Sequence, residues 1–204
     1  MPATLDAPPR TVAAPPAGSV SRVEYLLREE TAEVKSEWYD GEVREMSGVT
    51  WEHSLIATRI AVLLGAAVRG KQFSVHGSEL KVRMPDGPYV YPDAILAPAP
   101  AAAVLEPPVR PGGPRTVLLN PVAVVEVLSE STEENDRGFK ADGYRTIESL
   151  TDYLIVSQTD PVVEHHRRTP GGWRETVHTG RRAAVGLRAA GVTLTLADIY
   201  EALD

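Results

Sequence analysis

A single glutamate interrupts a short apolar stretch of the chain. Residues 122–128 read Val-Ala-Val-Val-Glu-Val-Leu, a run rich in β-branched residues that is typical of a strand buried on both faces. An ionised carboxylate in such a strand is costly unless a cation, a proton or several hydrogen-bond donors compensate it. Glu126 is therefore a candidate functional group, and a metal ligand in preference to a salt-bridged core residue.

A helix is expected directly after this strand. The polar residues 129–132 can cap it, and acidic residues follow in its first turns. Asp136, Lys140 and Tyr144 are spaced i, i+4 and i+8, so their side chains share one face of this helix. The helix would bring Lys140 back toward the end of the strand, although Lys140 could equally pair with Asp136 on an exposed face.

Two further acidic residues are candidate ligands. Asp93 follows Pro92 within an expected strand at residues 89–97, where proline favours an edge or a bulge that would redirect the Asp93 side chain. Glu52 lies at the start of an amphipathic helix, a position that also suits an ordinary acidic residue. Mg²⁺ prefers oxygen ligands and is typically held by one or two carboxylates, so a bound Mg²⁺ would neutralise Glu126, and Glu52 is a candidate extra ligand.

The elements that must position these residues alternate between helices and strands. The order predicts one α/β (α+β) domain, with a mixed sheet flanked by helices and extra hairpins near both ends of the chain. The expected helices are 20–30, 51–69, 132–147 and 196–203; the expected strands are 73–84, 89–97, 117–128 with a break near 120–121, 152–157 and 192–196; and the expected hairpins are 37–42 and 162–178.

Composition limits the domain organisation and the classes of function that are open to the chain. Residues 1–19 are rich in Ala and Pro and are expected to form a disordered leader, which leaves a single domain over residues 20–204. The chain has no cysteine, so disulfides and thiolate chemistry are excluded. No apolar run approaches membrane-spanning length, so a cytoplasmic protein without membrane contact is expected. The net charge of −7 argues against broad, nonspecific binding of nucleic acid.

Taken in order, these residues resemble the PD-(D/E)XK nuclease superfamily and, within it, the Uma-type family of restriction endonucleases. The resemblance covers roughly Glu37 to Leu203. Its motifs are Glu37 with Asp40-Gly41, Glu52-His53, Pro92-Asp93, Asn120-Pro121, Val125-Glu126-Val127-Leu128-Ser129, and Asp136-Arg137-Gly138 with Lys140 and Tyr144.

The resemblance implies a restriction-endonuclease-like core that hydrolyses DNA with Mg²⁺ or Mn²⁺, and a homodimer is plausible. Asp93 and Glu126 match the two metal-binding carboxylates. The superfamily's lysine normally stands two residues after the glutamate, where this chain has Leu128; Lys140 matches a lysine moved to the following helix, which would assist catalysis.

Two alternatives stay open. The protein could keep the nuclease fold but be weakly active or inactive, and serve as a binding or assembly module. It could also be another enzyme that uses paired carboxylates, such as a glycosidase, although aromatic residues make up only 6% of the chain and indicate no sugar platform.

Overall fold

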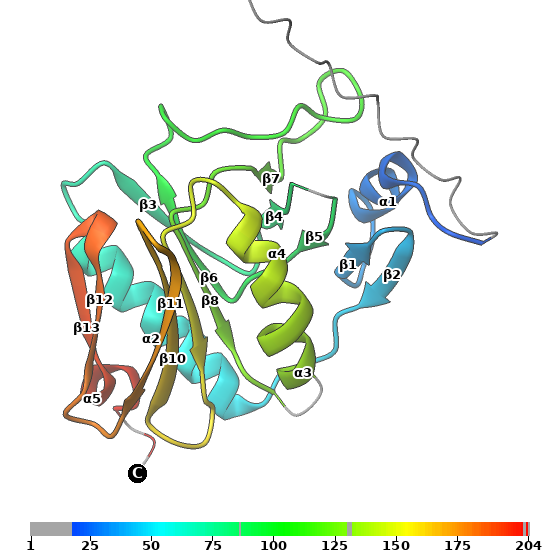
Figure 1. Ribbon diagram of the computed structural model, residues 1–204. Helices are drawn as coiled ribbons and strands as arrows, with labels where there is room; N and C mark the ends of the chain where they lie inside the picture. Colours follow the sequence, from blue (N-terminus) through cyan, green and yellow to red (C-terminus); the bar gives the residue numbers. More distant parts are fainter. Residues whose placement is uncertain (1–17, 86, 130–131, 202, 204) are drawn as a thin grey trace, which may run out of the picture.

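The computed structural model describes residues 18–85, 87–129, 132–201 and 203. Its centre is a six-stranded mixed sheet in the order β11-β10-β9-β8-β6-β3 (Figure 1). Only β8 and β9 run parallel within this sheet; its other neighbours are antiparallel. The strands are β3 (Phe73–Gly77), β6 (Ala94–Pro98), β8 (Ala123–Val127), β9 (Asp152–Val156), β10 (Val162–Thr169) and β11 (Gly172–Thr179).

A second sheet of five short strands has the order β2-β1-β5-β4-β7. Its strands are β1 (Ser36–Tyr39), β2 (Glu42–Glu45), β4 (Lys81–Arg83), β5 (Tyr89–Val90) and β7 (Val117–Leu118). The β1–β2 turn uses Asp40 and Gly41, both at positive φ (49° and 103°), as a tight hairpin between right-twisted strands requires. A separate antiparallel pair joins β12 (Ala184–Leu187) to β13 (Val192–Thr195).

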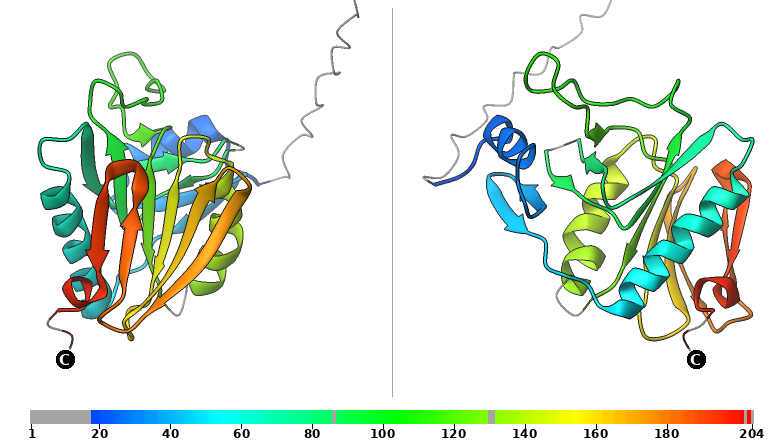
Figure 2. Two further views of the ribbon diagram at one scale, coloured as in Figure 1. Left: turned by 60° about the vertical axis from the view of Figure 1, so that its left-hand side comes forward. Right: turned by 180° about the vertical axis from the view of Figure 1, so that it is seen from behind.

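Helices cover both faces of the six-stranded sheet (Figure 2). The long helix α2 lies on one face, while α3, a π-helical turn η1 and α4 form one continuous helical segment on the other. Thr50 caps α2 by accepting a hydrogen bond from the His53 N–H, at 3.1 Å. The bounds are α1 (Arg22–Glu29), α2 (Trp51–Ala67), α3 (Glu133–Asn135), η1 (Asp136–Lys140), α4 (Ala141–Thr146), the 3₁₀ turn η2 (Arg188–Ala190) and α5 (Leu196–Ile199).

Successive side chains of β8 point to opposite faces of the sheet and therefore pack against both helical layers. Val125 and Val127 pack in the core that contains α2, whereas Val124 packs in the core that contains Tyr144 of α4. Glu126 alternates with these neighbours and therefore faces the α3–η1–α4 segment. The expected α/β (α+β) class, with a mixed sheet flanked by helices, is confirmed.

Two of the expected strands are wrong. Residues 73–84 and residues 89–97 each form two strands that belong to different sheets, since β3 and β6 lie in the large sheet and β4 and β5 in the small one. The break at Tyr91-Pro92-Asp93 follows from Pro92, which cannot donate a hydrogen bond to a neighbouring strand. The predicted break near Asn120-Pro121 is confirmed, and it separates β7 from β8.

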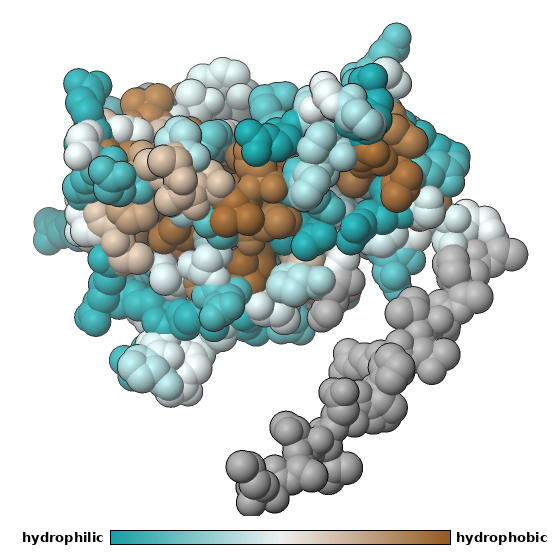
Figure 3. Space-filling view, turned by 90° about the horizontal axis from the view of Figure 1, so that it is seen from above, coloured by the Kyte–Doolittle hydropathy of each residue, from teal (hydrophilic) through white to brown (hydrophobic). Residues whose placement is uncertain are grey.

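Other expectations were closer to the structure. Both predicted hairpins are present, whereas β12 was not predicted. The leader predicted for residues 1–19 lies, up to residue 17, outside the described residues. None of the described helices has the length and apolar character needed to cross a membrane. Seen from above, hydrophobic side chains lie in several patches separated by polar ones (Figure 3).

Candidate active site

Asp93 and Glu126 lie side by side, because Asp93 directly precedes β6 and Glu126 is in the adjacent strand β8. Residue Ala94 pairs with Val125 in the antiparallel β6–β8 ladder, so Asp93, one residue earlier, lies beside Glu126, one residue later. The Oδ2 atom of Asp93 accepts a hydrogen bond from the backbone N–H of Val127, at 2.7 Å. Both carboxylates line one cavity of about 630 Å³. The structure thus brings together two residues that are 33 positions apart in the sequence (126 − 93).

Glu126 is buried and is held by two side chains of the helical segment. Its Oε1 atom lies 3.2 Å from Nζ of Lys140 and accepts a 2.7 Å hydrogen bond from the Tyr144 hydroxyl. Glu126 is only 3% exposed and Lys140 4%. The predicted common face of Asp136, Lys140 and Tyr144 is confirmed, because all three side chains are buried on the side of the helix that faces the sheet.

Lys140 contacts two carboxylates besides Glu126. Its Nζ atom lies 3.2 Å from Oε1 of Glu37 and 3.3 Å from Oδ1 of Asp136. Glu37 comes from β1 of the small sheet and accepts further hydrogen bonds from the Tyr91 backbone N–H, at 2.9 Å, and the Tyr39 hydroxyl. Glu37 and Tyr144 are not among the predicted catalytic or metal-binding residues, yet in the structure both contact the charged groups directly.

Burial and charge shift the pKa values of this cluster. Burial raises the pKa of Glu126 well above its ordinary value, and nearby Lys140 offsets only part of this effect. Burial also raises the pKa of Asp136. For Lys140, burial lowers the pKa, but the carboxylates of Glu126, Glu37 and Asp136 more than compensate, so its pKa lies well above the usual value. Lys140 is therefore a firmly charged ammonium.

His53 also belongs to this site, although it is not among the predicted catalytic or metal-binding residues. Its Nε2 atom lies 3.2 Å from Oδ2 of Asp93, and the residue lines the same cavity. Burial lowers the His53 pKa, but the hydrogen bond and the charge of Asp93 outweigh burial and raise it. Glu52, the predicted additional ligand, is exposed and is not among the residues that line this cavity. The first turn of α2 thus brings His53, and not Glu52, to Asp93.

The residues present suit a hard divalent cation. Among the described residues, Glu126 makes its hydrogen bonds through Oε1 alone, and Asp93 through Oδ2 alone. Each carboxylate therefore keeps a second oxygen for a ligand in the shared cavity. Three carboxyl groups, those of Glu37, Glu126 and Asp136, surround the single ammonium of Lys140, so a bound cation would reduce the repulsion between them.

The fold is similar to that of a solved structure. The chain superposes with a TM-score of 0.70 and 17% identity on an Anabaena variabilis ATCC 29413 protein described as "a putative nuclease belonging to DUF820", over 89% of this chain and 97% of that one. Residues 22–197 match the Uma2 family, described as "Putative restriction endonuclease". The chain belongs to this family, and the resemblance found in the sequence is confirmed.

Two relatives from Synechocystis sp. (strain PCC 6803) share most of their length with this chain. The uncharacterized protein slr1290 is 32% identical over 160 residues, which cover 78% of this chain and 80% of that protein. The uncharacterized protein sll1609 is 29% identical over 150 residues, which cover 73% and 81%.

Proposed function

We propose that the protein is a divalent-metal-dependent endonuclease that hydrolyses DNA phosphodiester bonds. The observation that carries the proposal is the position of Asp93, directly before β6, beside Glu126 on the adjacent strand β8, with Lys140 Nζ 3.2 Å from the Glu126 carboxylate. Membership of the Uma2 family supports the reaction class.

In this proposal Asp93 and Glu126 hold Mg²⁺ or Mn²⁺ through oxygens that make no hydrogen bond within the described chain. Such an ion, when bound, polarises the phosphodiester and lowers the pKa of a bound water. The backbone N–H of Val127 and the His53 ring fix the orientation of Asp93. Lys140 and Tyr144 fix Glu126 in the same way, through its Oε1 atom. Lys140 also supplies positive charge beside the phosphate.

Lys140 has a second task in this proposal. Its ammonium lies within 3.3 Å of the Glu126 and Asp136 carboxylates and opposes the burial that raises their pKa values, so it favours their ionised forms. An ionised Glu126 is the form that a metal requires. The lysine is therefore both a source of charge for the reaction and the group that prepares its ligand.

Replacing Asp93 by asparagine is expected to lower the rate of DNA cleavage about 100-fold or more, since a metal ligand loses its charge. The measurement is single-turnover cleavage of duplex and single-stranded DNA at saturating Mg²⁺ or Mn²⁺. Asp160→Asn, which changes an exposed carboxylate that does not line the cavity, is the matched control and should cut at the parent rate.

Two results would contradict the proposal. If Asp93→Asn cuts as fast as the parent, Asp93 is not a ligand of the reacting metal. If the parent binds metal and DNA but cuts no DNA with either ion, the protein is a binding module with a nuclease fold.

A further inference from the structure

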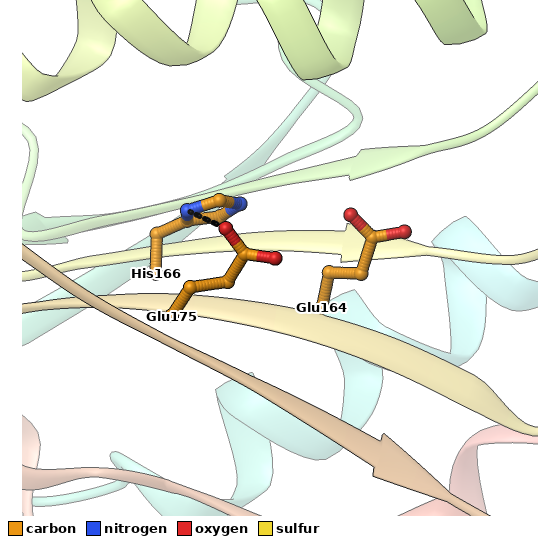
Figure 4. A group of neighbouring side chains, drawn as sticks. All are labelled: Glu164, His166 and Glu175. Atoms are coloured by element: carbon orange, nitrogen blue, oxygen red, sulfur yellow. Dashed lines mark ion pairs between the residues drawn. The ribbon is translucent and has the colours of Figure 1, made fainter.

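A second group of potential metal ligands lies on the β10–β11 hairpin, away from the candidate active site. His166 and Glu175 are directly opposite in the antiparallel register, and Glu164 lies two residues before His166 on the same face. Ligand atoms of the three side chains all lie within 4.8 Å of one another. Figure 4 shows the Glu175 carboxylate next to the His166 ring, with a dashed line to one ring nitrogen, and the Glu164 carboxylate farther to the right. None of the three residues lines the cavity of Asp93 and Glu126.

The histidine in this group is buried and has an unsatisfied nitrogen. His166 is 4% exposed and stacks on the ring of Tyr153, with centroids 5.6 Å apart. Its Nδ1 atom lies 3.0 Å from a guanidinium nitrogen of Arg145 and 3.7 Å from Oε2 of Glu175. Its Nε2 atom is buried and has no hydrogen-bond partner.

The contact with Arg145 decides where the ring proton lies. An arginine can only donate, so Nδ1 must accept and the proton of the neutral ring must lie on Nε2. A buried N–H without an acceptor is unfavourable by about 1–3 kcal/mol. Burial, followed by the charge of Arg145, lowers the His166 pKa, so the ring stays neutral instead of gaining a second proton. Neutral imidazole is the form of histidine that binds metal ions.

The charged groups around the His166 ring have an excess of negative charge that a divalent cation would balance. Arg137 pairs with Glu133 and Glu164, and Arg145 pairs with Asp142. With Glu175, these connected groups comprise four carboxylates and two guanidiniums, a net charge of −2. The nearby Arg168 donates instead to the backbone carbonyls of Leu150, Arg145 and Ile147 near the end of α4.

We propose that Glu164, His166 and Glu175 form a second metal site, which takes a divalent transition-metal ion such as Zn²⁺. One imidazole and two carboxylates are a ligand set that Zn²⁺ uses, with a fourth position for water. The ion would bind Nε2 once the ring proton has moved to Nδ1, where the N–H would donate a hydrogen bond to the Glu175 carboxylate oxygen that does not bind the ion. This exchange satisfies the nitrogen that lacks a partner in the present structure.

Arg145 lies next to the proposed ligands, with a guanidinium nitrogen 3.0 Å from Nδ1 of His166. Its guanidinium must move away from Nδ1 when the ring proton moves there. The guanidinium then still has an ion-pair partner in Asp142, whose carboxylate is 3.0 Å away. Arg145 therefore competes with the metal. This competition gives the proposal an unusual signature, because removing Arg145 should strengthen metal binding whereas removing a ligand should weaken it.

The test is a titration of the full-length protein with Zn²⁺, followed by NMR of the histidine ring nitrogens. The chain has five histidines, so His166 can be assigned from the spectrum of a His166→Gln variant. We expect micromolar Zn²⁺ to shift the His166 signals, and Glu175→Gln to weaken binding about tenfold or more. Arg145→Met should tighten binding roughly thirtyfold, as expected for removing one positive charge about 4 Å from a dication in water.

His178→Gln is the matched control, because His178 also lies on the β10–β11 hairpin but is outside the ligand group. It should leave Zn²⁺ binding at His166 unchanged. The proposal is overturned if the His166 signals stay in place in both the parent and Arg145→Met, or if Glu175→Gln binds Zn²⁺ as tightly as the parent. Signals that shift only at His53 would place the zinc at the other site and overturn it equally.

Discussion

Replacing Lys140 by methionine is expected to lower the free energy of unfolding by about 3–5 kcal/mol at pH 7, the usual cost of leaving buried charges without their partner. Methionine keeps most of the side-chain length but removes the ammonium. Glu37, Glu126 and Asp136 then face one another without the cation that lies 3.2–3.3 Å from each of them. The measurement is urea unfolding of the parent and the variant at pH 7.

The loss of stability in the same variant should depend on pH. Burial raises the folded-state pKa values of Glu126 and Asp136 above their ordinary values of 4.5 and 3.8, and Lys140 opposes this rise in the parent. An acid whose folded-state pKa is raised stabilises the fold while it is protonated, and this contribution is lost as the pH rises through the raised pKa. The stability gap between Lys140→Met and the parent should therefore be largest at pH 8 and should narrow toward pH 5.

The control for this prediction is Lys35→Met, which removes a lysine from a more exposed pair with Glu79. That change should cost less than about 1 kcal/mol, with little difference between pH 5 and pH 8. Lys140→Arg should restore little stability, because a planar guanidinium does not fit where three carboxylates surround a compact ammonium. An equal stability gap at both pH values would show that the buried carboxylates are not the cause.

Replacing Glu126 by glutamine is expected to abolish metal-dependent cleavage, with a loss of about 100-fold or more, while the fold stays intact. Glutamine can still accept the hydrogen bonds from Lys140 and Tyr144 through its side-chain oxygen. It cannot supply a charged ligand. Mg²⁺ or Mn²⁺ should therefore raise the melting temperature of the parent by binding the folded state, and should not raise that of Glu126→Gln.

Glu148→Gln, at an exposed position two residues after the end of α4, is the matched control. This variant should respond to metal like the parent. Cleavage and thermal stability are measured on the same samples, so that a loss of activity can be separated from a loss of folding. A metal-induced rise in melting temperature that survives in Glu126→Gln would exclude Glu126 as a ligand.

The part of the site that depends on local patterns could be predicted from the sequence. A charge inside a β-branched run identified Glu126, because burial is encoded in its immediate neighbours. The spacing of Asp136, Lys140 and Tyr144 placed them on one face, because that face follows from helix geometry alone. These inferences needed no knowledge of how distant segments pack.

The part that depends on packing between the two sheets could not be predicted. Glu37 reaches Lys140 only because β1 pairs with β5, which continues through Tyr91 toward Asp93. Strand propensity gives no information about which sheet a strand joins, so β3 and β4 were merged into one strand. Likewise, Glu52 and His53 are adjacent in the sequence, and only the direction of α2 against the sheet decides which one meets Asp93.

The π-helical turn at Asp136–Lys140 has a consequence for changes in chain length. Each of its hydrogen bonds spans five residues where an α-helix spans four, so the turn accommodates one additional residue between α3 and α4. Deleting the exposed Gly138 would remove that extra residue and leave Tyr144 facing Glu126. A deletion within α4 would instead rotate part of the helix by about 100° relative to the rest. This turn is therefore the position in the segment where the loss of a residue is most readily tolerated.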